Sequence, residues 1–399
     1  VDKIVKLEFS PAEQDLYNIF AKNAKDRVKM LTAQQEKSLG GRSYVHILQS
    51  ILRLRLICAH GRDLLDEEDL KLTQGISKDA AIDLDEEPEI RGLNPQQVYQ
   101  MYNLMKETNA DRCFVCSMQI GRNTPDNEDE KEEVLGHMTP CFHLICRDCI
   151  KEHKRATLAS SRDGGKTATC SLCHAENSAD FFPLKASEAD EALEGVDKTK
   201  GPKKMPPYTG PHTKTRELVR ELLHHDEWSL LNPEEAPIKS VVFSTWTSHL
   251  DLIQRALEDH HITYTRLDGR MSRPARGQAL DVFRTDPRIH VILVSISAGG
   301  LGLNLTTANK VYVMEPQYNP AAEAQAIDRV HRLGQVREVE TVRFVMKNSF
   351  EEKMLELQEK KRKLASFTVD REKDARGLVG GTRADATRKR LEDLRSLFK

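Results

Sequence analysis

Eight side chains that can ligate a metal ion are gathered between residues 113 and 173 of the chain. Seven of the eight cysteines of the protein lie there, in closely spaced pairs around one histidine. In order they are Cys113, Cys116, Cys141, His143, Cys146, Cys149, Cys170 and Cys173. A two-residue gap lets both thiolates of a pair turn onto one ion at about 2.3 Å, and eight ligands make two tetrahedral sites. With no secretory signal in view, the spacing predicts zinc ligands in preference to disulfides.

The segment around these ligands is poor in apolar residues, so it can hardly bury a core of its own. We expect the two ions to supply much of its folding free energy. The plainer alternative is a purely structural zinc module without activity.

A second group of residues with possible chemistry follows an apolar run near Ser295, where the sequence reads VILVSISAGGLGLNL. The small residues of this loop, among them Ser297, Gly300 and Gly302, leave backbone N–H groups able to approach a phosphate. Taken alone the loop is weak evidence, because glycines often serve only to turn a chain.

Two arginines give the loop its significance. Arg329 and Arg332 are three residues apart and are predicted to share one face of a helix that also carries Gln325. Two guanidinium groups directed at a γ-phosphate would stabilise charge in the transition state, as an arginine finger does. The alternative is an exposed helix face that pairs with Asp328 or Glu323.

The elements that must position these residues alternate between β-branched strands and amphipathic helices from His212 onward. This pattern predicts a parallel α/β sheet covered by helices on both faces. The expected strands are Ser240–Thr245, Thr263–Leu267, His290–Ile296, Lys310–Met314 and Glu340–Val345, and the expected helices are Ser248–Asp259, Arg276–Arg284 and Ala321–His331.

The first part of the chain is predicted to be helical. Ser10 is a helix N-cap and Glu13 completes a capping box. A second helix, from about Ser43 to Cys58, is too densely apolar for a single stripe and is expected to be buried on several sides. An acidic linker covers Asp63–Pro88, and a short helix begins at Asn94-Pro95.

Charge and hydropathy exclude some classes of protein. Sixty basic residues against 62 acidic ones leave a net charge of −2, so a nucleic-acid surface must be a local patch. No apolar run approaches the roughly 18 residues of a membrane span. The start VDKIVKLEFS lacks the profile of a signal peptide, and we expect an intracellular protein.

Several motifs resemble those of one protein family. The order SAGGLGLNL, NP and QAIDRVHRLGQ resembles motifs V and VI of Swi/Snf-type DNA translocases. KSVVFSTWTSHLDLI is similar to their motif IV, and SFEEKMLELQEKKRKL resembles the helix that braces their two motor lobes. The Cys-His-Cys-Cys core resembles a RING finger. Its place before the second lobe, with the helix ILQSILRLRLICAH, is similar to the helicase-like transcription factor group and its fungal DNA-repair relatives.

The resemblance implies a RecA-like second motor lobe of a nuclear, ATP-dependent double-stranded DNA translocase. It assigns Arg329 and Arg332 as arginine fingers, and Gly300, Gly302 and Gln325 to the nucleotide edge. The residues that it offers to DNA phosphates are Ser244, Thr245, Arg276, Ser295 and Ser297. Such contacts grip DNA without reading its sequence.

The RING pattern also implies an interleaved arrangement of the zinc ligands. One ion is assigned to Cys113, Cys116, Cys146 and Cys149, and the other to Cys141, His143, Cys170 and Cys173. Val115 and His174 are the expected contacts with a ubiquitin-conjugating enzyme. Ubiquitin ligases of this type commonly have arginine or lysine where this chain has His174, a weaker clamp. A ubiquitin ligase and a non-catalytic binding module both stay open.

The implied domain order has the end of the first lobe and a helical protrusion at 1–62, a linker at 63–108 and the RING finger at 109–184. A second linker at 185–211, the motor lobe at 212–348 and a brace helix with tail at 349–399 follow.

Neither a GxxxxGK[ST] loop nor a DExH sequence occurs, and Gly164–Thr167 is interpreted as a polar loop. ATP and Mg²⁺ would therefore be bound mainly by a first lobe outside this chain, which should not hydrolyse ATP alone. Cys58 and His60 are interpreted as a buried cysteine and its neighbour, not as a metal pair.

Overall fold

The structure is a computed structural model in which two compact units are recognised. The large unit comprises residues 1–19, 54–65 and 204–399, and the small unit comprises 20–53 and 66–203. Within them the structure describes residues 1–33, 41–65, 69, 95–107, 111–116, 118–120, 134–159, 167–170, 176–178, 180–185, 210–268, 271–296 and 303–371. No helix among these residues is both long and apolar enough to cross a membrane.

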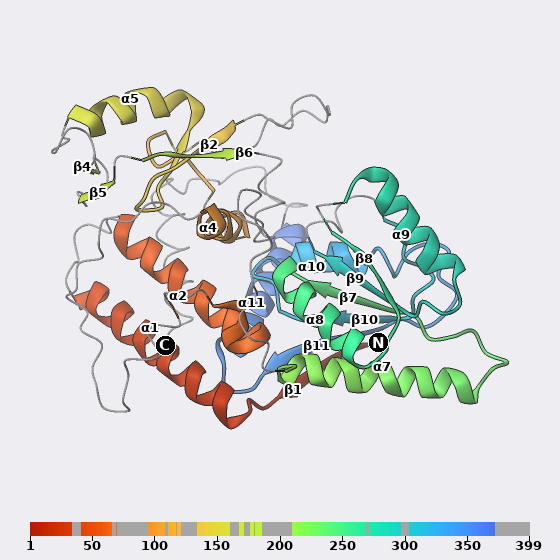
Figure 1. The fold of residues 1–399 in the computed structure, drawn as a ribbon. Coiled ribbons are helices and arrows are strands. Elements are labelled where there is room, and N and C mark those ends of the chain that lie inside the picture. The colour runs from red at the N-terminus through yellow and green to blue at the C-terminus, as the bar shows by residue number, and fades with distance from the viewer. Residues whose placement is uncertain are drawn as a thin grey trace. The chain divides into compact units, whose positions relative to one another are not determined.

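The large unit is built on a six-stranded sheet whose neighbouring strands all run parallel (Figure 1). In spatial order the strands are β1 (Asp2–Leu7), β11 (Glu340–Met346), β10 (Lys310–Val313), β7 (Ser240–Ser244), β9 (Val291–Ser295) and β8 (Tyr264–Leu267). The predicted parallel α/β sheet is thereby confirmed, and five of the six strands lie where the sequence predicts them.

Helices cover both faces of this sheet because successive side chains of a strand point to opposite faces. On β7, Val242 packs with α7 (Thr213–Leu231) and α8 (Thr247–Asp259). Its neighbours Val241 and Phe243 pack with α9 (Arg273–Thr285) and α10 (Pro320–Ile327). All three side chains are fully buried. The continuous apolar run of a central parallel strand is thus explained by two cores.

The sequence does not predict β1. Its residues Asp2–Leu7 comprise three charged and three apolar side chains without strict alternation, and they pair with β11 at the edge of the sheet. Four of the six side chains are exposed, so hydrophobic periodicity does not mark this strand and only the pairing with β11 reveals it.

The capping box at the start of α1 (Pro11–Ala33) is confirmed. The backbone N–H of Ser10 donates to Oε2 of Glu13 at 2.7 Å, and the Glu13 N–H donates to Oγ of Ser10 at 3.4 Å. The second predicted helix is α2 (Gly41–His60), which η1 (Gly61–Leu64) follows. Both ends of the box are occupied as the sequence predicts.

The helix predicted over Ala321–His331 is shorter than expected. It ends at Ile327, and residues 328–330 form turns. The N–H groups of Arg329 and Val330 donate to the carbonyls of Ala326 and Ile327, three residues back, so the chain winds more tightly here than an α-helix does. The two arginines therefore lie in a turn after the helix and not along one helical face.

The small unit contains α4 (Pro95–Glu107), which begins where the sequence predicts a helix start, and α5 (Arg147–Ala159). Three antiparallel strands, β3 (Leu144–Cys146), β2 (Val134–Met138) and β6 (Phe182–Lys185), form one sheet. A second pair is β4 (Thr167–Thr169) with β5 (Glu176–Ser178). The segment Gly164–Lys166 and nearly all of the acidic linker lie outside the described residues. The last element that the structure describes in the large unit is α11 (Phe350–Arg371).

Candidate functional site

The carboxyl ends of the central strands meet at one edge of the large sheet. Ser244, the last residue of β7, lies beside Ser295, the last residue of β9. Parallel α/β sheets place their ligand sites at this edge. The loop that follows β9 lies outside the described residues, and with it Ser297, Gly300 and Gly302.

A buried carboxylate organises this edge. Glu315, just beyond β10, accepts from the Ser244 hydroxyl at 2.9 Å and from the Thr245 N–H at 3.0 Å. Its side chain also pairs with the imidazole of His249, from α8. Burial by itself raises the pKa of Glu315, but His249 and the hydrogen bonds outweigh it and hold the pKa below its usual value. No catalytic motif in the sequence marks Glu315, although a glutamate just after a buried strand is a signal that could have found it.

This arrangement bears on the predicted DNA contacts. The hydroxyl of Ser244 is committed to Glu315, and both Ser244 and Ser295 are fully buried. The Thr245 hydroxyl accepts from the side-chain amide of Gln317 at 2.6 Å. Arg276 is half-buried in the first turn of α9. The structure thus makes the serines part of the sheet edge itself, and their role toward DNA stays a prediction.

Buried side chains and a hydrogen bond hold the turn that carries Arg329 and Arg332. Ala326 and Val330 are buried in the core, while Arg329 is half-buried and Arg332 is exposed. The side chain of Gln335 donates to the carbonyl of Ala308 at 2.7 Å and so holds the end of the turn. Gln325 is exposed on α10. The backbone of the turn is therefore fixed, while the side chain of Arg332 remains at the surface.

A buried ion pair joins α7 and α11 of the large unit. The ammonium group of Lys214 donates to Oε1 of Glu351 at 2.6 Å and to the carbonyl of Met314 at 2.7 Å. Burial raises the pKa of Glu351 against the lowering effect of Lys214. No sequence motif marks this pair, because its residues are far apart in the chain.

In the small unit, four cysteines from two distant segments meet. Sγ atoms of Cys113, Cys116, Cys146 and Cys149 all lie within 4.8 Å of one another. The Sγ atoms of Cys116 and Cys146 are 3.6 Å apart. This is too long for a disulfide and near the edge of about 3.8 Å in a tetrahedron with 2.3 Å zinc–sulfur bonds. The set is compact enough for its four thiol groups to share one metal ion.

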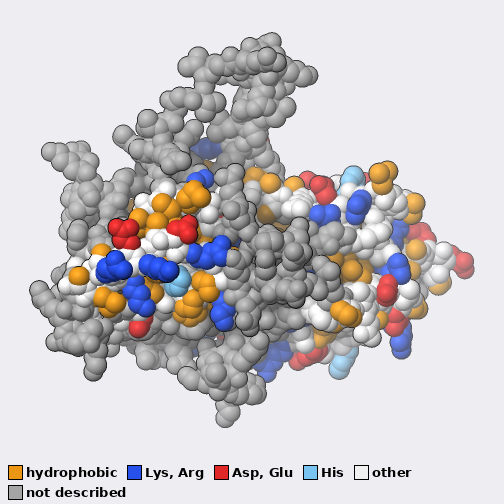
Figure 2. All heavy atoms as spheres, turned by 90° about the horizontal axis from the view of Figure 1, so that it is seen from above, with side chains coloured by type: hydrophobic (Ala, Val, Ile, Leu, Met, Phe, Trp, Pro, Cys, Tyr) orange, Lys and Arg blue, Asp and Glu red, His pale blue; other side chains and the backbone are white. Residues whose placement is uncertain are grey.

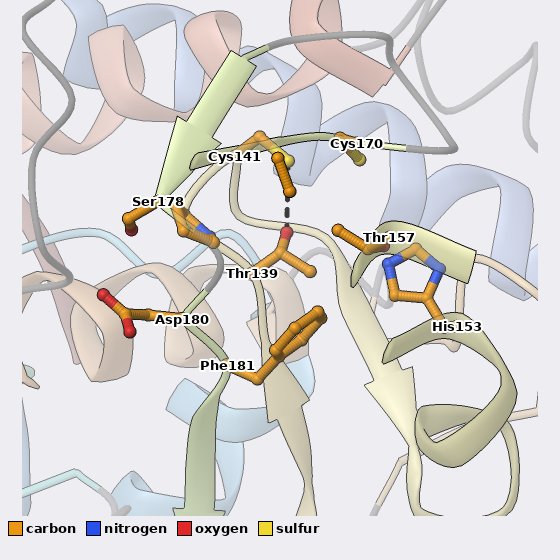
Figure 3. A pocket seen from close by; sticks show the side chains of 10 residues that line it. Thr139, Cys141, His153, Thr157, Cys170, Ser178, Asp180 and Phe181 are labelled. Atoms are coloured by element: carbon orange, nitrogen blue, oxygen red, sulfur yellow. Dashed lines mark hydrogen bonds between the residues drawn. The ribbon is translucent and has the colours of Figure 1, made fainter. Parts of the chain in front are cut away.

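A second group contains Cys141, His143 and Cys170. Nδ1 of His143 lies 3.0 Å from Sγ of Cys141 and 3.6 Å from Sγ of Cys170. The hydroxyl of Thr139 contacts Cys141 at 3.2 Å and accepts from the His143 N–H at 2.9 Å, which orients both groups (Figure 3). Cys173, the fourth expected ligand, lies outside the described residues.

The chemistry of the first set also fits a cation. Burial and then the neighbouring thiols raise the pKa of Cys149, and burial raises that of Cys146. Four thiolates so close together repel one another, so they can be deprotonated together only around a metal ion.

Two further surfaces belong to this unit. Val115 and Met118, in the segment that contains Cys113 and Cys116, are 50% and 65% exposed. The exposed face of α5 carries basic side chains, which gather on the surface shown in Figure 2. They are Arg147, Lys151, Lys154 and Arg155. Met118 was not among the predicted contacts, and His174 lies outside the described residues.

Comparison with known proteins identifies the large unit. The helicase conserved C-terminal domain family matches residues 216–334. The chain is 33% identical over 374 residues to the DNA repair protein RAD5 of Gibberella zeae, covering 91% of this chain and 31% of that protein. It is 30% identical over 415 residues to RAD5 of Candida albicans, covering 99% and 35%. This chain is a Rad5-type homologue of the Swi2/Snf2 group.

A plant relative extends the comparison. The DNA repair protein RAD5B of Arabidopsis thaliana is 29% identical over 404 residues, covering 100% of this chain and 27% of that protein. The chain thus spans about a third of the length of the curated relatives that it matches. Among solved structures, the C-terminal part of the Fun30 ATPase domain has a TM-score of 0.46 and 18% identity, covering 90% of this chain and 89% of that chain. The helicase match ends two residues after Arg332, so the turn with both arginines belongs to the matched domain.

Proposed function

We propose that this chain is the C-terminal part of an ATP-dependent double-stranded DNA translocase that acts in DNA repair in the nucleus. Arg329 and Arg332, in the turn after α10, would complete an ATP site whose phosphate loop belongs to a preceding motor lobe. The observation that carries this proposal is the turn itself. Buried Ala326 and Val330 fix its backbone within a helicase C-terminal domain, while Arg332 stays exposed.

The residues of this chain would act by positioning and charge. When ATP and Mg²⁺ are held by the other lobe, the two guanidinium groups would stabilise the negative charge that develops on the γ-phosphate. Gln325 would line the nucleotide together with Gly300 and Gly302. Ser244, Thr245, Arg276, Ser295 and Ser297 remain the proposed contacts with the DNA backbone, which a motor must grip at any sequence.

The first test uses the complete parent protein, because this chain alone lacks half of the site. Arg329→Ala and Arg332→Ala should each lower DNA-stimulated ATP hydrolysis by about 10³-fold. The matched control is Arg284→Ala, since Arg284 is an exposed arginine of α9 that pairs with Asp281. Unchanged ATPase rates in both finger variants would refute the assignment.

The zinc-ligand clusters favour a second activity, that of a RING-type ubiquitin ligase. Cys113, Cys116, Cys146 and Cys149 would hold one Zn²⁺, and Cys141, His143, Cys170 and Cys173 the other. The bound ions would hold the loops that carry these ligands in a fixed conformation. Exposed Val115 would then contact a ubiquitin-conjugating enzyme, with His174 at the other side of its docking surface. The competing function is a non-catalytic zinc module that only recruits a partner.

A pair of variants distinguishes a ubiquitin ligase from a non-catalytic zinc module. Cys113→Ser should abolish both the retention of zinc by its own cluster and polyubiquitin synthesis, with Cys58→Ala as the cysteine control outside both clusters. Val115→Asp should abolish polyubiquitin synthesis and keep the zinc, because the side chain is at the surface. If the wild-type protein makes no polyubiquitin with any of a broad panel of conjugating enzymes, only the binding function is left.

A further inference from the structure

Three potential ligands meet in the large unit, which contains neither cysteine cluster. His60 is the last residue of α2, Asp63 lies in η1, and His212 directly precedes α7. One ligand atom from each lies within 4.8 Å of the other two. The chain leaves the large unit after Leu65 and returns to it at residue 204, so this cluster joins the two points between which the small unit is inserted.

The distances within the cluster fit a small divalent ion. Oδ2 of Asp63 lies 3.5 Å from Nδ1 of His60 and 3.9 Å from Nε2 of His212. Ligands held at 2.0–2.1 Å in a tetrahedron are about 3.3 Å apart, so a slight contraction would close the site. Side-chain exposures of 0%, 5% and 14% for His60, Asp63 and His212 leave little room for solvent to compete.

Without a bound ion, the buried carboxylate of Asp63 lies in an unfavourable environment. Oδ2 of Asp63 is buried and makes no hydrogen bond to any residue that the structure describes. It points between the two ring nitrogens, which are too distant for hydrogen bonds of normal length. Leaving a charged acceptor unsatisfied in a protein interior is costly, and a cation between the three groups would remove that cost.

A second carboxylate orients one of the imidazoles. Nδ1 of His212 donates to Oε1 of Glu13 at 2.7 Å, which leaves the lone pair on Nε2, the nitrogen that faces Asp63. Glu13 is itself held by the N–H and the hydroxyl of Thr213, at 2.9 and 2.6 Å. Histidines that bind metals characteristically donate their other N–H to a carboxylate in this way.

A glycine makes room for the same ring. Gly61 has φ of +59°, and a Cβ there would come within 1.8 Å of Cε1 of His212. No other residue type allows the ring to lie so close to the backbone between His60 and Asp63.

We propose that His60, Asp63 and His212 form a third metal site, for a divalent first-row transition ion of the zinc type. Two imidazole nitrogens and one carboxylate oxygen are ligands that suit such an ion. The site is distinct from the two cysteine clusters and would clamp together the exit and re-entry points of the inserted small unit. His60 thus pairs with Asp63 and His212 and not with Cys58.

The experiment measures zinc in the purified full chain by mass spectrometry. The wild type and the control His224→Ala, an exposed histidine of α7, should hold about one zinc per chain more than Asp63→Asn or His212→Ala. Glu13→Gln keeps all three ligands and should weaken zinc binding at this site roughly 10- to 100-fold. A role of Glu13 in folding alone would not produce that graded loss.

A second measurement covers the case in which the ligand variants fail to fold. Wild-type chain treated with a mild chelator should take up Co²⁺ with the visible absorption of a nitrogen and oxygen site, without a thiolate-to-cobalt band. Cys113→Ser should preserve this signal. The proposal is overturned if the folded Asp63→Asn variant holds as much zinc as the wild type, or if the wild type takes up cobalt only with thiolate absorption.

Discussion

Lys214 and Glu351 form a fully buried ion pair, with 2.6 Å between the ammonium nitrogen and the carboxylate oxygen. Removing one member leaves the other charge buried without compensation. Lys214→Met and Glu351→Leu alone should therefore each lower the free energy of unfolding by about 3–5 kcal/mol, whereas the double variant Lys214→Met/Glu351→Leu should restore most of it. Urea denaturation of the four proteins in this cycle measures the coupling. Glu352→Gln, which breaks only the exposed pair with Lys6, is the control and should cost less than about 1 kcal/mol.

The second prediction concerns Glu315 at the sheet edge. Glu315→Ala leaves the Thr245 N–H and the His249 ring without their acceptor, and we expect a loss of about 3 kcal/mol in unfolding free energy. Glu315→Gln keeps an acceptor oxygen and should cost less. Glu338→Ala removes an exposed glutamate and should leave the melting curve in place. Equal melting temperatures for all three variants would contradict the role given to Glu315.

The third prediction is a pH dependence. Nδ1 of His290 lies 2.7 Å from Oδ1 of Asp226, and this hydrogen bond raises the pKa of His290 above its ordinary 6.5. Because the folded state holds the proton more tightly, the pair stabilises the fold fully below pH 6.5, and this stabilisation is lost as the pH rises through the raised pKa. The stability difference between wild type and Asp226→Asn should therefore shrink from pH 6 toward pH 9 in urea titrations. A difference that grows with pH would contradict it.

The fourth prediction compares two glycines. Gly61→Ala forces an L-residue into the left-handed region and against the His212 ring, so it should destabilise the chain by at least about 1–2 kcal/mol. Gly277, inside α9, has open space around it, and Gly277→Ala should instead stabilise by about 0.5–1 kcal/mol. Thermal unfolding of the two variants decides this, and a shift of the same sign in both would refute the argument.

Local patterns in the sequence determine much of the architecture. The strands around Val242 and Leu293 are predicted by their apolar β-branched runs, and the capping box of Ser10 and Glu13 forms as predicted. In each case the decisive physics acts over a few residues: burial on both faces of a strand, or two hydrogen bonds within one helical turn. Cysteine spacing likewise predicts which pairs of the small unit can share an ion.

Tertiary structure decided what depends on distant partners. Strand β1 exists only because β11 offers it an edge, and the turn after α10 is tied to Leu305 through the carbonyl of Arg329. Glu315 joins Ser244, and His212 joins Asp63, across long stretches of chain. No local propensity encodes such meetings, since their free energy arises only after folding has removed water from groups that the sequence keeps far apart.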